Sequence, residues 1–136
     1  MKKQFGFSLM ELLIVVAIVG IIAAIAIPSY QSYLIRSNRS DAIHTMLAMQ
    51  LAQEKYRMNN TSYGTLAQVW SGVSVTEGGH YNLAISNVSA TTYTITATAT
   101  GSQSGDAEGA TSCATLRLAY ANGTTTKTPA ACWFEG

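Results

Sequence analysis

Apolar residues are concentrated in one uninterrupted stretch near the start of the chain. From Phe7 to Ile27 the only charged side chain is that of Glu11, and the rest is rich in Leu, Ile, Val and Ala. A helix rises about 1.5 Å per residue, so a helix of this length spans the roughly 30 Å hydrocarbon layer of a membrane. The pattern therefore predicts a membrane-spanning helix over 7–28, apolar on all sides.

The next segment, 29–58, contains good helix formers and neither Gly nor Pro. Its apolar residues form a broad stripe on a helical wheel, which Arg39, Gln50, Gln53 and Arg57 interrupt. We expect one side of this helix to be covered by its own domain and another side by neighbouring molecules in an assembly. The polar run 59–64 then ends the helix.

The pattern changes to short alternating runs in the last third of the chain. Three runs, 81–86, 92–100 and 115–120, alternate apolar and polar residues and predict three strands. A hairpin loop at 87–91 joins the first two, and the Gly- and Ser-rich segment 101–112 is expected to be a flexible surface loop. The predicted fold class is α+β, with a long N-terminal helix packed on a small antiparallel sheet.

Composition and charge exclude several functions. Residues 59–136 carry a net charge of −2, which argues against a nucleic-acid partner because such binding usually leaves a basic footprint. The chain has no catalytic or nucleotide-binding motif, so we expect no enzymatic activity, no cofactor and no metal site. Asp106 and Glu108 are the only hint of calcium; without the spacing of a calcium loop, they are expected to be solvated.

The two cysteines, Cys113 and Cys132, are separated by 18 residues and match no zinc-site spacing. In an exported protein such a pair forms a disulfide, and closing a loop of about 20 residues stabilises the fold by about 3 kcal/mol. The alternative is a pair of unlinked buried thiols, which would fit a cytosolic chain.

A single carboxylate within the apolar stretch needs an explanation, because a charge inside a membrane is unfavourable by about 2.5–3.5 kcal/mol at the centre. No basic residue lies within one helical turn after Glu11. Cleavage between Gly6 and Phe7 would create an amino group one turn before it, and the helix dipole also favours an acid there. Two alternatives remain: Glu11 extends to the lipid headgroups, or the stretch is a secretory signal cut near residues 23–26.

These residues resemble a known family. Residues 2–6, followed by the run from Phe7 to Ile18 with Glu11 in fifth place, look like the leader and helix start of type IV pilins and pseudopilins. The resemblance implies that residues 1–6 form a cytoplasmic leader, that a prepilin peptidase cuts after Gly6 and methylates Phe7, and that Glu11 pairs with the Phe amine of a neighbouring subunit during assembly.

Gly20 and Pro28 weaken the predicted helix, because Gly disfavours helix by about 1 kcal/mol and Pro removes a backbone hydrogen bond. Either the helix kinks or melts between them, or Pro28 begins a new helix in its first turn. The resemblance to pilins favours the kink.

The globular head, 59–136, also resembles that of a pilin, in particular minor pilins of the PilE type. The resemblance implies an αβ loop over 59–80 and a disulfide-bounded D-region over 113–132. The resemblance implies a type IV pilus subunit, held in the bacterial inner membrane and then built into an extracellular filament for adhesion, twitching motility or DNA uptake. Its partners would be other pilins, the prepilin peptidase, the assembly machinery and membrane lipid.

The alternatives are a type II secretion pseudopilin, a DNA-binding receptor pilin and a membrane-anchored ectodomain that never assembles. If the chain is a DNA-binding receptor pilin, reversing the charge of Arg117 and Lys127 should weaken DNA uptake.

Overall fold

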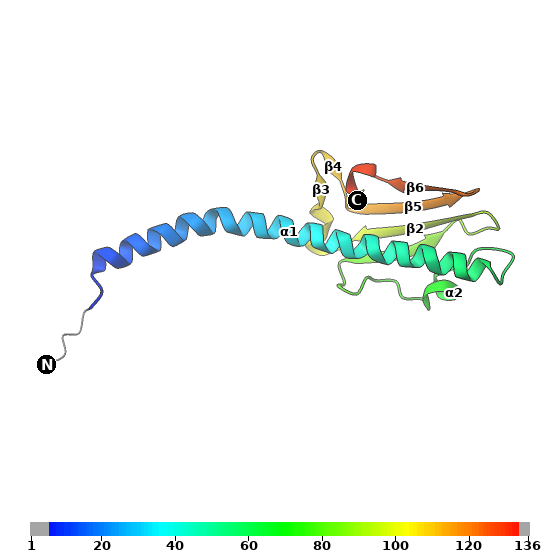
Figure 1. The fold of residues 1–136 in the computed structure, drawn as a ribbon, viewed down its shortest axis with the longest axis horizontal. Helices are drawn as coiled ribbons and strands as arrows, with labels where there is room; N and C mark the ends of the chain where they lie inside the picture. The colour runs from blue at the N-terminus through cyan, green and yellow to red at the C-terminus, as the bar shows by residue number, and fades with distance from the viewer. Residues whose placement is uncertain (1–5, 134–136) are drawn as a thin grey trace. The chain divides into compact units, whose positions relative to one another are not determined.

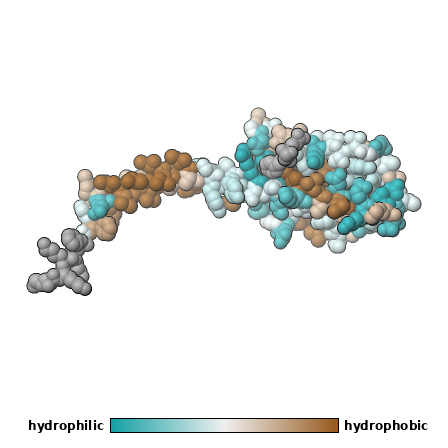
Figure 2. Space-filling view, viewed as in Figure 1, coloured by the Kyte–Doolittle hydropathy of each residue, from teal (hydrophilic) through white to brown (hydrophobic). Residues whose placement is uncertain are grey.

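The computed structural model describes residues 6–133, and the chain divides into two compact units, residues 1–34 and 35–136. The first unit contains the N-terminal part of the long helix α1 (Leu9–Arg57). Nearly all side chains of this part are exposed, and Figure 2 shows a hydrophobic surface over it. An 18-residue window there has a mean hydropathy of 2.9, so the helix is long and apolar enough to cross a membrane.

The second unit is built on a four-stranded antiparallel sheet (Figure 1). Its strand order is β1 (Tyr81–Ser86), β2 (Thr92–Ala99), β5 (Thr115–Ala121) and β6 (Thr124–Thr128). A separate two-stranded hairpin consists of β3 (Ala107–Glu108) and β4 (Thr111–Ser112). The remaining elements are the short helix α2 (Leu66–Trp70) and two 3-10 turns, η1 (Gly101–Gly105) and η2 (Ala130–Cys132). The α+β class is confirmed.

The core lies between the C-terminal half of α1 and one face of this sheet. Residues spaced three or four apart on α1 are buried, as one helical face requires: Arg39, Ala42, Ile43, Met46, Met49 and Gln53. The inward residues of the strands meet them, because side chains alternate along a strand: Tyr81, Leu83, Tyr93, Ile95, Ala97, Leu116 and Leu118. The alternation expected from the sequence is therefore confirmed in all three predicted strands.

A fourth strand, β6, was not predicted, and the expectation of a three-stranded sheet is wrong. Its residues Thr124–Thr128 are all exposed and show no apolar alternation. The strand forms because its backbone pairs antiparallel with β5, in a register that joins Ala121 to Thr124 and Arg117 to Thr128. Backbone pairing at a sheet edge requires no hydrophobic alternation, so that pattern was silent. The missed signals were the dipeptide Asn122-Gly123, a hairpin turn in which both residues have positive φ, and the Thr-rich run after it.

The expectation of a flexible loop at 101–112 is also wrong. This segment contains η1 and the β3–β4 hairpin, and it buries the side chains of Gln103 and Asp106. The Gln103 side-chain amide donates to the carbonyl of Ile35 on α1 at 2.9 Å. Gly and Ser suggest a loop by composition, but contacts with residues more than 60 positions away in sequence order it.

Candidate functional site

The predicted processing and assembly residues lie at the beginning of α1, in the first unit. Phe7 precedes the helix and its side chain is 81% exposed, and Glu11 is exposed in the first helical turn. Among residues 6–133, Glu11 forms no ion pair. An unpaired carboxylate on an apolar helix is the arrangement that the assembly hypothesis requires, because its counter-charge must come from outside the described subunit.

Gly20 and Pro28 both lie inside α1, which continues through them. A side chain at Gly20 would contact nothing, so no contact within the described residues requires glycine at this position. Around Pro28, the hydroxyls of Ser29 and Ser32 donate to the carbonyls of Ile25 and Pro28, each at 3.1 Å. Such bonds back to the preceding turn tend to bend helices. A kink or local melting in a filament stays a prediction.

The disulfide between Cys113 and Cys132 is confirmed, and it joins the residues before β5 to η2. Both half-cystines are buried. A guanidinium nitrogen of Arg39 (Nη1) donates to the sulfur of Cys113 at 2.7 Å, so α1 contacts the disulfide directly.

Arg39 also organises a buried ionic cluster that sequence reasoning missed. Its Nη2 donates to Glu108 Oε2 at 2.7 Å, and its Nε lies 3.4 Å from Asp106 Oδ2. Glu108 also accepts from the exposed Arg36, with a separation of 2.9 Å. The expectation of solvated acids is therefore wrong for Asp106, whose side chain is 1% exposed, whereas Glu108 is 35% exposed and is held by two arginines. The sequence signal was Arg39 itself, one of the polar residues that interrupt the apolar stripe of the helix.

The pKa values in this cluster follow from its geometry. The hydrogen bond from Arg39 is the main cause that holds the pKa of Glu108 below its ordinary value, since it stabilises the ionised carboxylate. Burial raises the pKa of Tyr81, whose hydroxyl donates to Asp106, to about 12. The cluster therefore keeps Glu108 charged and Tyr81 neutral near neutral pH.

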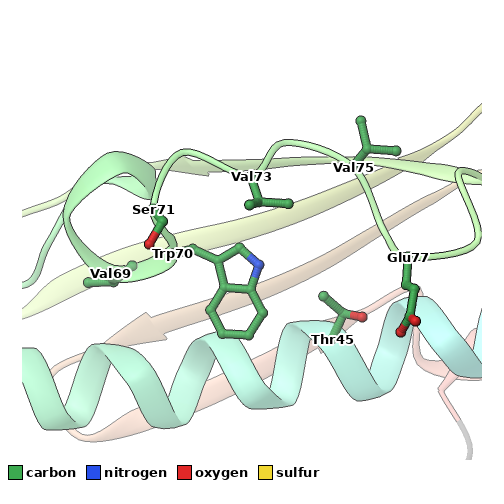
Figure 3. A pocket seen from close by; sticks show the side chains of 7 residues that line it. All are labelled: Thr45, Val69, Trp70, Ser71, Val73, Val75 and Glu77. Atoms are coloured by element: carbon green, nitrogen blue, oxygen red, sulfur yellow. The ribbon is translucent and has the colours of Figure 1, made fainter.

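A pocket of about 490 Å³ lies between α1 and the loop that follows α2 (Figure 3). Its apolar wall contains Val69, Trp70, Val73 and Val75, and its polar groups come from Thr45, Ser71 and Glu77. Glu77 is the one charged residue in this lining, so the pocket disfavours an anion such as a phosphodiester. Neither histidine takes part, and among the described residues no group of three metal-ligating side chains exists.

Charge is distributed unevenly over the sheet. The four strands contain no Asp or Glu, and their two charged residues are Arg117 on β5 and Lys127 on β6. The carboxylates of residues 35–133 belong instead to α1, to the loop beside it or to the Arg39 cluster: Asp41, Glu54, Glu77, Asp106 and Glu108. The strands thus carry two cations and no carboxylate, but the register places them on opposite faces of the sheet, because Arg117 pairs with Thr128 and Lys127 pairs with the buried Leu118.

Two sequence families match the chain, and together they cover residues 1–117. Residues 28–117 match the family described as type IV minor pilin ComP, DNA uptake sequence receptor. Residues 1–27 match the prokaryotic N-terminal methylation motif. The chain belongs to the type IV pilins. The resemblance found in the leader and the helix start is thus confirmed.

Individual pilins are similar over shorter stretches. The chain is 54% identical to a fimbrial protein of Pseudomonas aeruginosa over 54 residues, which cover 40% of this chain and 35% of the relative. It is 37% identical to the fimbrial protein EcpC of Eikenella corrodens over 98 residues, covering 71% and 63% of the two chains. With the type IV major pilin protein PilE1 of Neisseria gonorrhoeae it shares 47% identity over 57 residues, covering 42% and 34%. The matched stretches therefore span between about one third and two thirds of these pilins.

Proposed function

We propose that this pilin is a minor subunit of a type IV pilus that takes part in DNA uptake. The observation that carries the proposal is the match of residues 28–117 to a family of minor pilins described as DNA uptake sequence receptors. The adjoining match of residues 1–27 to the prokaryotic N-terminal methylation motif also supports a pilus subunit. The four strands contain no Asp or Glu, so the acids that give the head its net negative charge lie outside the sheet.

Before assembly, residues 7–28 hold the subunit in the bacterial inner membrane. The exposed apolar surface of this segment supports that role, since apolar surface of this extent is unfavourable in water. The prepilin peptidase hydrolyses the peptide bond between Gly6 and Phe7, removes the leader 1–6 and methylates the new amine. The inner-membrane machinery then transfers the apolar helix from lipid to the filament, where neighbouring pilins replace the lipid contacts.

Mass spectrometry of pili sheared from the cell surface tests processing and export together. We expect this pilin in the fibre fraction, with Phe7 as its first residue and a mass increased by one methylation. A chain that stays in the membrane fraction of piliated cells, or that begins at another residue, would contradict the pilus subunit.

The DNA uptake role is tested in a strain that lacks this gene but still assembles pili. Such a strain should bind and import less labelled duplex DNA than the parent, and a plasmid copy of the gene should restore both. Unchanged uptake by piliated cells without this pilin would contradict the role in DNA uptake and leave the pilus subunit intact.

A further inference from the structure

We infer that Asn122 is a site of spontaneous deamidation, a covalent modification that loosens the edge strand β6. Asn122 and Gly123 form the two-residue turn between β5 and β6, which Figure 1 shows side by side at one edge of the sheet. The inference concerns the chemistry of the head alone, so it is independent of the proposed role in DNA uptake.

The turn exposes the two reacting groups to water. Asn122 and Gly123 have positive φ values of 49° and 88°, the combination that a two-residue hairpin turn of type I′ requires. The hydrogen bond of such a turn joins the flanking residues, here Ala121 and Thr124, so it does not use the N–H of Gly123. Asn122 and Gly123 are exposed, and among residues 6–133 neither this N–H nor the Asn122 side-chain amide forms a hydrogen bond.

The reaction needs only water. The backbone nitrogen of Gly123 loses its proton to a solvent base and attacks the side-chain carbon Cγ of Asn122, which forms a new C–N bond. The bond from Cγ to Nδ2 then breaks, and ammonia leaves with a proton taken from water, so that a cyclic succinimide remains. Water opens this ring at one of its two carbonyls. Cleavage of the new C–N bond gives aspartate, whereas cleavage of the original peptide bond gives isoaspartate, in which the backbone continues through the side chain.

Glycine at position 123 makes Asn122 reactive. A residue that follows asparagine shields its own nitrogen with its Cβ, but glycine has no Cβ and its backbone is the least restricted. A Cβ at Gly123 would meet nothing within 4 Å among the described residues, so the rest of the head does not shield this nitrogen either. Asn122 is the one asparagine of the sequence that is followed by glycine.

Asn87 provides a comparison within the same protein. It is exposed and has the same left-handed backbone conformation, with a φ of 53°. However, its side-chain amide donates to the hydroxyl of Thr94 at 3.4 Å, and the next residue is Val88, whose branched Cβ hinders attack by its nitrogen. Asn87 therefore shares the conformation of Asn122 without its reactivity.

The surroundings of Asn122 also favour the charged product. Asn122 and Arg57 line the same pocket of about 330 Å³, whose lining among the described residues includes no acid. A nearby guanidinium stabilises an ionised carboxylate. The fold therefore does not oppose the negative charge that deamidation creates.

Isoaspartate in the turn disturbs β6 more than the other strands. Its additional backbone atom does not fit a two-residue turn, whose geometry sets the register of Ala121 with Thr124. All five residues of β6 are exposed, so the strand depends on its backbone pairing with β5. The disulfide of Cys132, in η2 just after β6, keeps the strand attached. We therefore expect local opening of β6 and not unfolding of the head.

The test follows the mature full-length pilin in detergent micelles during a long incubation near neutral pH in heavy-oxygen water. Mass spectrometry of its peptides measures the conversion of each asparagine, because hydrolysis of the succinimide adds one solvent oxygen. The control variant Asn122→Gly removes the reactive amide and keeps a residue that readily adopts positive φ. Circular dichroism verifies that this variant is folded, and a synthetic peptide of residues 118–127 gives the reactivity of the unfolded turn.

We expect the Asn122 peptide of the parent to gain heavy oxygen and to yield both aspartate and isoaspartate, while the Asn87 peptide stays unchanged. Amide exchange in Thr124–Thr128 should rise in the converted parent, but neither in β1 nor in the incubated Asn122→Gly variant. An intact Asn122 at the time when the synthetic peptide is converted, or equal conversion of Asn87, would overturn the modification site. Equal exchange of β6 in the converted parent and in the incubated variant would overturn the loosening of β6.

Discussion

The guanidinium of Arg39 lies between the carboxylates of Asp106 and Glu108 and the sulfur of Cys113, and its side chain is fully buried. It connects α1 with the β3–β4 hairpin and with the disulfide. Removing one partner of a buried ion pair is strongly destabilising, because the remaining charge loses its compensation. The Arg39 side chain therefore links α1, the β3–β4 hairpin and the disulfide to one another.

We predict that Arg39→Ala lowers the free energy of unfolding of the head by about 3–5 kcal/mol. The physical reason is that Asp106 would remain buried without its counter-charge. Urea unfolding followed by circular dichroism measures the change. The matched control is Arg36→Ala, which removes an exposed partner of the same Glu108 and should change the free energy of unfolding by about 1 kcal/mol or less. Equal effects of the two variants would contradict the assignment.

The pKa of Glu108 predicts a pH dependence of stability. Because its pKa is lowered in the folded state from the ordinary value of 4.5, its contribution is fully present above that value and is lost as the pH falls below it towards the folded pKa. The urea midpoint of the parent protein should therefore fall on acidification below about pH 4.5. Glu108→Gln should lose less over the same range, so the two curves should converge at low pH. Parallel curves would show that Glu108 has no part in the acid dependence.

At the scale of elements, the disulfide closes the segment that contains the β5–β6 hairpin. Cys113 lies just before β5, and Cys132 lies in η2 after β6. The edge strand β6 has no buried side chain of its own, so it depends on backbone pairing with β5 and on this covalent closure. An exposed edge strand of this kind is otherwise prone to pair with other chains.

Removing the disulfide should destabilise the head by about 3 kcal/mol, the chain-entropy value for a loop of about 20 residues. The double variant Cys113→Ser/Cys132→Ser tests this by urea unfolding, and amide hydrogen exchange in β6 should rise more than exchange in β1. The parent protein under reducing conditions serves as the control and should match the variant. Uniformly raised exchange in both strands would indicate a global rather than a local role.

At the scale of the whole molecule, the two units differ in where their apolar side chains lie. Residues 7–34 expose apolar side chains almost throughout, whereas residues 35–133 enclose a core of their own. Part of α1 in the second unit also stays uncovered, with Leu47 40% and Leu51 58% exposed. Such surfaces are available to lipid or to other subunits, as the broad apolar stripe suggested.

We predict that Glu11→Ala leaves the protein processed at Phe7 and membrane-bound but prevents its incorporation into pili. The carboxylate would otherwise pair with the amine of a neighbouring subunit, and its loss removes that pairing without shortening the apolar helix. Immunoblots of sheared fibres and membranes measure the distribution. Met10→Ala, also in the first turn, is the control and should enter fibres normally. Normal incorporation of the Glu11 variant would refute the pairing.

Much of this architecture follows from local pattern. The apolar run beginning at Phe7, the helix after it and the alternating strands at 81–86 and 115–120 are visible in the sequence, because helix and strand periodicity act over a few residues. The motif around Gly6, Phe7 and Glu11 is equally local, so the family was apparent before the fold was known. The pairing of Cys113 with Cys132 required only that two cysteines be present in an exported chain.

Tertiary structure alone decided the rest, because it depends on residues that are distant in sequence. Arg39 and Glu108 are 69 positions apart, and only folding brings them within 2.7 Å and turns a supposed loop into an ordered hairpin. Strand β6 lacks the apolar alternation of the other strands, and its pairing with β5 depends on backbone bonds across the Asn122-Gly123 turn. The net charge of the chain is a sum over all surfaces, and only the fold shows that Arg117 and Lys127 lie on opposite faces of the sheet.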